Sequence, residues 1–135
     1  MKKNKLQRAF TLLELLVVIS IIGILIALGV TSYMTAQRKS RDAKRKADLE
    51  TVRQSLILYR QDNGDYGDVS VFNDTVSALF TGEYITSSTI IDPKTSDATY
   101  FYSLACTGTV VTACSRVELT APLETETSDY VIYTP

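Results

Sequence analysis

The feature that most constrains this chain is a stretch of 23 residues, 15–37, without a charged side chain. It overlaps an almost unbroken apolar run over residues 10–30, in which Leu, Ile and Val dominate. As a helix, that run would be about 32 Å long, which is enough to cross the hydrocarbon core of a bilayer. A secretory signal would have a shorter apolar region closed by a small-residue cleavage site, and none closes this run. The sequence therefore predicts a membrane-spanning helix that stays with the protein.

The rest of the 135-residue chain is more polar and leaves room for one small globular domain. Four apolar residues at intervals of three, four and three predict that the helix continues as an amphipathic one: Leu49, Val52, Leu56 and Tyr59. The sequence Asp-Asn-Gly at 62–64 is typical of a helix end with Gly in the cap region. We therefore expect one helix over about residues 10–61.

Shorter elements are expected after this helix. Asn73 or Asp74 could cap a short helix that Gly82 ends. Strands are predicted over residues 99–105, 110–119 and 130–133. The predicted fold class is α+β, in which a long N-terminal α-helix packs on a small C-terminal antiparallel sheet.

Two cysteines, Cys106 and Cys114, have seven residues between them and lie at the facing ends of the first two predicted strands. In an exported protein they would form one local disulfide, whereas in a cytosolic protein they would be free thiols. The chain has no histidine, which excludes Ser-His-Asp and Cys-His catalysis and every imidazole metal site. We therefore expect no enzyme and no catalytic residue.

Glu14 is the exceptional residue of the apolar run. A carboxylate inside a membrane helix costs about 2.5–3.5 kcal/mol on insertion scales and usually has a function. A new N-terminal amine at Phe10 would be its best partner, within one helix or between two staggered subunits. Alternatively, Glu14 could reach the lipid headgroups, because it lies only four residues inside Phe10. The residues alone favour neither interpretation.

The residues around Glu14 form a specific pattern. Residues 8–18 read Arg-Ala-Phe-Thr-Leu-Leu-Glu-Leu-Leu-Val-Val and overlap a basic leader, residues 1–9. This pattern resembles the class III signal of type IV prepilins and type II secretion pseudopilins, and most nearly the major pseudopilin G subtype. The resemblance implies that prepilin peptidase cleaves between Ala9 and Phe10 and methylates the new amine. It also implies that Glu14 guides each subunit into register during assembly.

The same resemblance implies that the chain is a structural subunit of a type IV pilus-like or type II secretion pseudopilus filament. Its parts would be a cleaved leader (1–9), a transmembrane and assembly helix (10–30), a stalk helix (31–61) and a globular head (62–135). The implied partners are further copies of the chain, other pilins, prepilin peptidase, membrane lipid and the inner-membrane assembly platform. The expected location is the cytoplasmic membrane, crossed once, with the head on the periplasmic or extracellular side. The alternative is a membrane-tethered minor pilin or binding module that captures DNA or an exported substrate.

A cluster of six basic residues follows the apolar run: Arg38, Lys39, Arg41, Lys44, Arg45 and Lys46. A solvated face or a contact with lipid headgroups is the simplest interpretation. A second interpretation is salt bridges to acidic residues of neighbouring subunits. Contact with DNA, which needs only clustered Lys and Arg, is the weakest of the three.

Two acidic stretches are calcium candidates. Asp62, Asp65 and Asp68 do not meet the EF-hand pattern and fit a helix-ending turn better. Relatives of the secretion subtype often hold calcium in the C-terminal loop. In this chain the oxygen ligands of that loop would come from Glu124, Glu126, Ser128 and Asp129. A solvated acidic loop is the preferred interpretation, so no cofactor is expected and calcium is the alternative.

Overall fold

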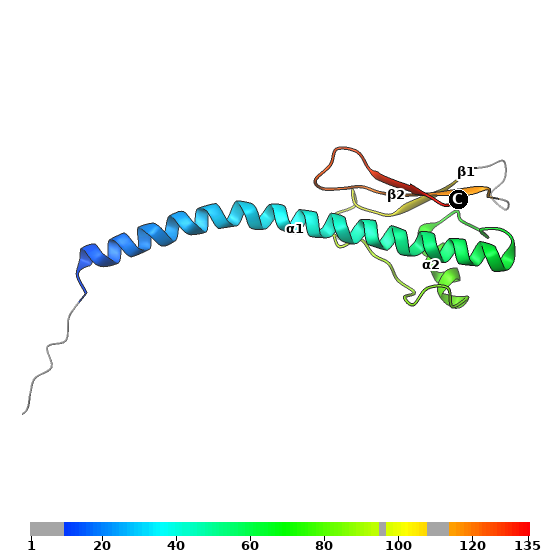
Figure 1. Cartoon of the computed structure of the whole chain (residues 1–135), viewed down its shortest axis with the longest axis horizontal. Helices are drawn as coiled ribbons and strands as arrows, with labels where there is room; N and C mark the ends of the chain where they lie inside the picture. Colours follow the sequence, from blue (N-terminus) through cyan, green and yellow to red (C-terminus); the bar gives the residue numbers. More distant parts are fainter. Residues whose placement is uncertain (1–9, 95–96, 108–113) are drawn as a thin grey trace, which may run out of the picture. The chain divides into compact units, whose positions relative to one another are not determined.

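The computed structural model describes residues 10–94, 97–107 and 114–135 (Figure 1). Within them the elements are, in chain order, α1 (Leu12–Asn63), α2 (Phe72–Thr81), β1 (Ser103–Thr107), β2 (Arg116–Ala121) and β3 (Tyr130–Tyr133). The chain divides into two compact units, Met1–Gln37 and Arg38–Pro135, and we call the second the head unit. The predicted α+β class is confirmed, with one long N-terminal helix and a small antiparallel sheet.

In the first unit, α1 carries large apolar side chains on all sides, and every described residue of this unit is exposed. By length and composition alone, α1 is the one helix of the described residues that could cross a membrane. Several of its hydroxyl groups donate to carbonyls of the same helix. Ser20 Oγ donates to Leu16 O over 2.8 Å, and Thr35 Oγ1 donates to Thr31 O over 3.2 Å. A helix that is apolar all round and bonds hydroxyl groups to its own carbonyls suits a lipid environment.

The core of the head unit lies between α1, α2 and one face of the sheet. Leu49, Val52 and Leu56 of α1 are fully buried, and Tyr59 packs partly buried against them, which confirms the predicted amphipathic face. The opposing buried residues of α2 and β2 are Val76, Leu79, Val117 and Leu119. Burying such side chains stabilises a fold by about 1.5–3 kcal/mol each, so this contact holds the head unit together.

The sheet has the order β1-β2-β3, and both pairs are antiparallel. The third predicted strand, β3, is confirmed, and the first two predicted strands are shifted. The first begins at Ser103 instead of residue 99, because a turn occupies its expected start, where Tyr100 N donates to Asp97 O over 3.1 Å. The second begins at Arg116 and extends to Ala121, which is buried and pairs with Tyr130. Residues 110–113 of that prediction lie outside the described residues.

The end of α1 matches the prediction closely. The helix ends at Asn63, and Gly64 follows with φ of 87°, a conformation that favours glycine. Its N–H donates to Arg60 O over 2.8 Å and so satisfies one of the last helix carbonyls.

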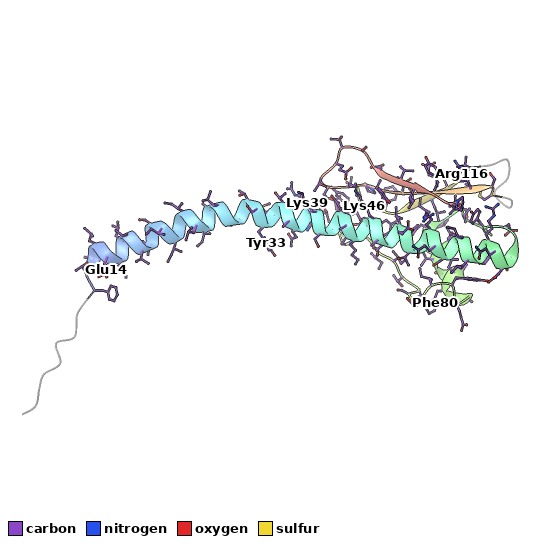
Figure 2. The ribbon with its side chains drawn as sticks, viewed as in Figure 1. Glu14, Tyr33, Lys39, Lys46, Phe80 and Arg116 are labelled. Atoms are coloured by element: carbon purple, nitrogen blue, oxygen red, sulfur yellow. A yellow bond between two sulfur atoms is a disulfide. The ribbon has the colours of Figure 1, made fainter. Side chains whose placement is uncertain are left out.

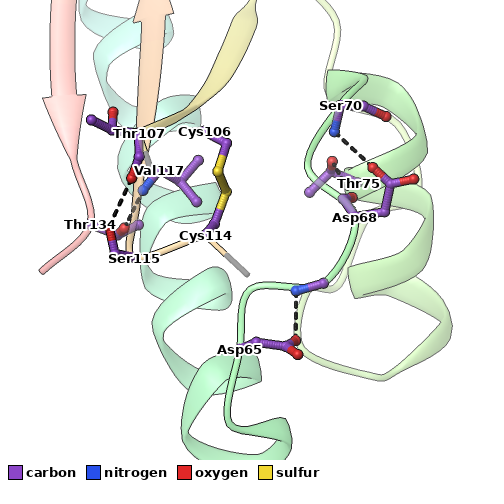
Figure 3. Close-up of a disulfide and its surroundings, with 11 residues drawn as sticks. Asp65, Asp68, Ser70, Thr75, Cys106, Thr107, Cys114, Ser115, Val117 and Thr134 are labelled. Carbon is purple, nitrogen blue, oxygen red and sulfur yellow. Dashed lines mark hydrogen bonds between the residues drawn. A yellow bond between two sulfur atoms is a disulfide. The ribbon is translucent and has the colours of Figure 1, made fainter. Parts of the chain in front are cut away.

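The acidic stretch after this end forms turns, as Figure 3 shows. Asp65 Oδ1 accepts from Gly67 N over 2.9 Å, and Asp68 Oδ1 accepts from Ser70 N over 3.1 Å. In such turns a carboxylate binds the backbone two residues further on. The interpretation of this stretch as a helix-ending turn is therefore confirmed.

The start of α2 differs from the prediction. The helix begins at Phe72 with Val71 at the N-cap and no side-chain cap, so the capping role predicted for Asn73 or Asp74 is wrong. Phe72 is buried, and its ring centroid lies 5.2 Å from that of Tyr102. Burial of Phe72, one turn before the buried Val76, places the helix start ahead of the polar pair. Tertiary packing here overrides the local capping preference.

The structure confirms the expectation that α2 ends at Gly82. The residue with a left-handed backbone conformation is the next one, Glu83. Glu83 has φ of 62°, while Tyr84 N donates to Leu79 O over 2.9 Å and Glu83 N to Phe80 O over 3.1 Å. This is the Schellman pattern of helix ends. A Cβ at position 82 would lie 2.7 Å from the Tyr84 ring, so any larger residue there would require that ring to shift.

Candidate assembly motif and ion-pair cluster

The first turn of α1 is built by a capping residue. Thr11 precedes the helix, and its Oγ1 accepts from Glu14 N over 3.2 Å. Thr11 and Glu14 therefore hold the two positions of a capping box, in which such a threonine stabilises a helix by about 0.5–2 kcal/mol. The motif that carries the family resemblance is thus also a helix-start signal.

The carboxylate of Glu14 lies on this first turn, as Figure 2 shows, where the helix dipole favours negative charge. It is exposed, and no cation of the described residues contacts it. Phe10 is 76% exposed and directly precedes Thr11, while Ala9 lies outside the described residues. Within the described residues, the Glu14 carboxylate therefore still lacks the cationic partner that the sequence analysis expected it to need.

A cluster of buried ion pairs in the head unit centres on Arg45, which is 0% exposed. Its guanidinium binds Asp92 through two bonds, Nε to Oδ2 over 2.6 Å and Nη2 to Oδ1 over 2.9 Å. Nη1 donates to Asp42 Oδ1 over 2.7 Å and to Glu124 Oε1 over 3.1 Å. The ring of Tyr100 lies 4.5 Å from the guanidinium carbon. Arg45 thus joins α1 to two segments that are distant in sequence.

Asp42 is the second member of this cluster. Its carboxylate accepts from Glu124 N and Thr125 N, each over 2.9 Å, and from Thr125 Oγ1 over 2.7 Å. Burial alone would raise the pKa of Asp42. The bonds donated by the backbone of Glu124, by Thr125 and by Arg45 outweigh burial and hold the pKa below its ordinary value. Asp42 therefore remains ionised and fixes the backbone of the C-terminal loop to α1.

Glu124 completes the cluster through a second arginine. Arg41 donates to both carboxylate oxygens of Glu124, over 2.6 Å each. The hydrogen bond from Arg41 lowers the pKa of Glu124 against the effect of burial, and Arg45 lowers it further. A more exposed pair, Lys46 Nζ with Glu126 Oε1 over 2.9 Å, lies beside these residues in sequence. The loop is thus bound to α1 by three cations.

The predicted disulfide between Cys106 and Cys114 is present, as Figure 3 shows. Cys106 lies in β1, and Cys114 lies two residues before β2. Next to them, Ser115 Oγ donates to Thr107 O over 2.8 Å. Because Cys106 and Val117 are register partners, the bond closes the β1–β2 connection at the point where strand pairing begins.

The comparisons with known proteins agree with the N-terminal pattern. The family model described as "Prokaryotic N-terminal methylation motif" matches residues 4–30. The type II secretion system core protein G of Escherichia coli is 39% identical over 66 residues, which cover 49% of this chain and 46% of that protein. The protein of the same name from Klebsiella pneumoniae is 42% identical over 60 residues, covering 44% and 43%. That of Vibrio cholerae is 36% identical over 66 residues, covering 49% and 45%.

The chain is therefore similar, over about half of its length, to type II secretion system core proteins G and carries the prokaryotic N-terminal methylation motif. It spans less than half the length of the curated relatives that it matches. No solved structure matches it significantly. The expected resemblance to the G subtype is confirmed by the relatives' common name.

In this pilin-like chain the basic cluster after the apolar run is divided in a way that the sequence did not predict. Arg41, Arg45 and Lys46 pair with carboxylates of the same chain. A solvated face is the wrong interpretation for the buried Arg45, whereas Lys46 stays partly exposed. A sequence signal for this was present. Asp42 and Arg45 continue the spacing of the apolar face of α1 by two further turns, so the pattern itself placed them against the head.

The calcium candidates of the pilin-like chain are partly occupied by these pairs. Glu124 binds Arg41 and Arg45, Glu126 binds Lys46, and Ser128 and Asp129 are exposed. Within the described residues, no group of three or more His, Cys, Asp or Glu side chains could hold a metal ion. Calcium binding by this loop stays an untested alternative, and the cations that its carboxylates contact are guanidinium and ammonium groups.

Replacing both cysteines by serine is expected to lower the free energy of unfolding of the head unit by about 2–3 kcal/mol. The reason is that the disulfide closes a short loop and thereby restricts the unfolded chain. Urea unfolding of the detergent-solubilised full chain, followed by near-ultraviolet circular dichroism of its tyrosines, would measure the difference. A reducing agent should destabilise the wild type and leave the double variant unchanged. Equal unfolding midpoints for the two oxidised proteins would contradict the prediction.

Proposed function

We propose that the chain is a structural subunit of a type II secretion pseudopilus or a similar type IV pilus-like filament. The observation that carries this proposal is the methylation motif at residues 4–30, which includes the start of a helix that is apolar and exposed on all sides up to residue 37. A helix of this kind has two stable environments, a bilayer and the apolar core of a helical assembly. The subunit would be stored in the first and polymerised into the second.

The proposal gives Phe10 and Glu14 complementary roles. Cleavage after Ala9 would create an amine at Phe10, four residues before Glu14. In a staggered assembly, the amine of one subunit would pair with the Glu14 carboxylate of its neighbour. This pairing would satisfy both groups away from water, where each alone is costly. The family motif supports it, and so does the lack of a cation against Glu14 within the described residues.

Partners and location follow from the same proposal. Prepilin peptidase would process the chain, and the membrane, other pseudopilins and an assembly platform would be its partners. The subunit would cross the cytoplasmic membrane once, with the leader on the cytoplasmic side and the head on the other side. The Cys106–Cys114 disulfide supports an oxidising compartment for the head. The relatives carry the name of a secretion-system core protein, which supports a structural function in place of an enzymatic one.

Capture of DNA by a tethered head is the weaker alternative. Phosphate binding relies on unpaired Lys and Arg side chains. Three of the six clustered cations are bound to carboxylates of the same chain, which reduces the positive charge available to DNA. Salt-dependent retention of the full chain on duplex DNA, unaffected by loss of filaments, would favour this alternative over the filament subunit.

Intact-mass analysis of the membrane-derived protein should show a chain that begins at an N-methylated Phe10. This outcome follows from a motif in which Ala9 and Phe10 flank the cleavage site. The same chain made in cells without prepilin peptidase is the control and should retain residues 1–9. A mature chain that begins at another residue would contradict the proposed processing.

A further inference from the structure

The three remaining cations of the basic cluster have no partner among the residues that the structure describes. Arg38, Lys39 and Lys44 are exposed, and no described residue forms an ion pair or hydrogen bond with any of them. Their neighbours Arg41 and Arg45, in contrast, are bound to carboxylates of the head unit. The fold therefore separates the cluster into cations that hold the head together and cations that are free to bind something else.

The free cations surround the helix. An α-helix turns by about 100° per residue, so Lys39 lies about 100° and Lys44 about 240° around the axis from Arg38. Along the axis the three lie within about 9 Å. A flat partner, such as a duplex or the side of another protein, contacts one face of a helix. Cations on several sides at nearly one level fit a partner that encloses the helix.

The chain before these cations indicates that partner. Arg38 directly follows residues 15–37, the stretch without charge, whose apolar side chains are exposed on all sides. Tyr33 lies near the end of this stretch and is 68% exposed (Figure 2). Apolar span, aromatic residue and basic residues in this order are typical of a membrane–water interface. Basic residues next to a span attract anionic headgroups by about 1 kcal/mol each.

We propose that Arg38, Lys39 and Lys44 form a cationic collar that binds the anionic headgroups of the membrane around the unassembled subunit. This inference rests on the membrane residence that the proposed function includes. The collar would fix the depth of the helix in the bilayer. Assembly into a filament would release these lipids.

The test uses the full chain in vesicles of phosphatidylcholine and phosphatidylglycerol in a 3:1 ratio. The chain has no tryptophan, so Tyr33→Trp introduces a single tryptophan beside the collar, whose fluorescence can be excited apart from that of the tyrosines. Quenching by brominated phosphatidylglycerol, compared with brominated phosphatidylcholine, measures which lipid surrounds it. Wild-type cations should enrich phosphatidylglycerol by about threefold or more over random mixing. The variant R38Q/K39Q/K44Q should return the ratio to random mixing.

A matched control removes three other positive charges, in the variant R53Q/K94Q/R116Q. Two of these cations pair with carboxylates and the third lies over the Tyr133 ring, so this variant should keep the enrichment. Enrichment that persists in R38Q/K39Q/K44Q, or that both triple variants lose equally, would overturn the collar. Random mixing in the wild type, with self-association that depends on the three cations, would assign them to a second copy instead. A chain that alkaline washing removes from the vesicles would overturn the membrane residence itself, and the collar with it.

Discussion

Replacing Arg45 by methionine is expected to lower the free energy of unfolding of the head unit by about 3–5 kcal/mol. Arg45 is 0% exposed and binds Asp92, Asp42 and Glu124, so its loss leaves buried carboxylates without a cation. Methionine retains much of the apolar stem, which separates the charge effect from the effect of a cavity. Urea unfolding of the detergent-solubilised full chain would measure it. A loss of this size is a large fraction of the stability of a small domain.

Lys46→Met is the matched control for Arg45. Lys46 makes one ion pair, with Glu126, in which both side chains are about half exposed. Such pairs contribute about 0–1 kcal/mol, because water screens them and long side chains lose freedom. The two variants should therefore differ by several-fold in their effect. Equal losses would show that the buried cluster is not what holds the C-terminal loop on α1.

The pH dependence of this difference has a definite sign. Asp42 and Glu124 have pKa values held below their ordinary ones, so the stability that they contribute is present above about pH 4. It is lost as the pH falls through the lowered values of the folded protein. In Arg45→Met the same carboxylates have lost their cation and are stabilised by protonation. The gap between wild type and variant should therefore narrow on acidification, and a gap that widens would contradict this explanation.

Replacing Glu14 by leucine is expected to abolish filaments while leaving protein level, membrane insertion and cleavage after Ala9 near normal. Insertion becomes easier without the carboxylate, and the Thr11 cap uses the backbone N–H of residue 14, which leucine keeps. Assembly would bury the Phe10 amine without a partner. A cost of about 3–5 kcal/mol corresponds to at least a hundredfold loss in the association constant. Sheared-fraction blotting and electron microscopy of overproducing cells would measure filament yield.

Two further variants separate charge from shape at this position. Glu14→Gln keeps the size of the side chain and removes its charge, so it should also lose filaments. Asp74→Asn removes a carboxylate from the exposed first turn of α2 and should leave filament yield unchanged. Normal filaments from a cleaved Glu14→Leu protein would reject the pairing with Phe10. Loss of cleavage in that variant would instead place Glu14 in recognition by the peptidase.

The sequence alone was sufficient for the elements that local chemistry determines. The apolar helix, the buried face from Leu49 to Tyr59 and the stop at Gly64 were predicted, because each depends on spacing or on one backbone conformation. The pairing of Cys106 with Cys114 was predicted as well, since the chain offers one possible pair. The motif around Phe10 and Glu14 was also visible in the sequence, because it is a contiguous pattern.

Tertiary structure decided the features in which distant segments compete. Because Phe72 packs in the core, α2 begins earlier than its sequence predicts. Because a turn forms at Asp97, β1 begins later than predicted. Above all, Arg45 binds Asp92 and Glu124, which lie 47 and 79 residues further along the sequence, and no local pattern predicts such contacts. From the sequence alone, a cluster of like charges is interpreted as a solvated surface. Only the tertiary structure shows that carboxylates pack against part of it. The division into bound cations and free ones therefore exists only in the folded chain.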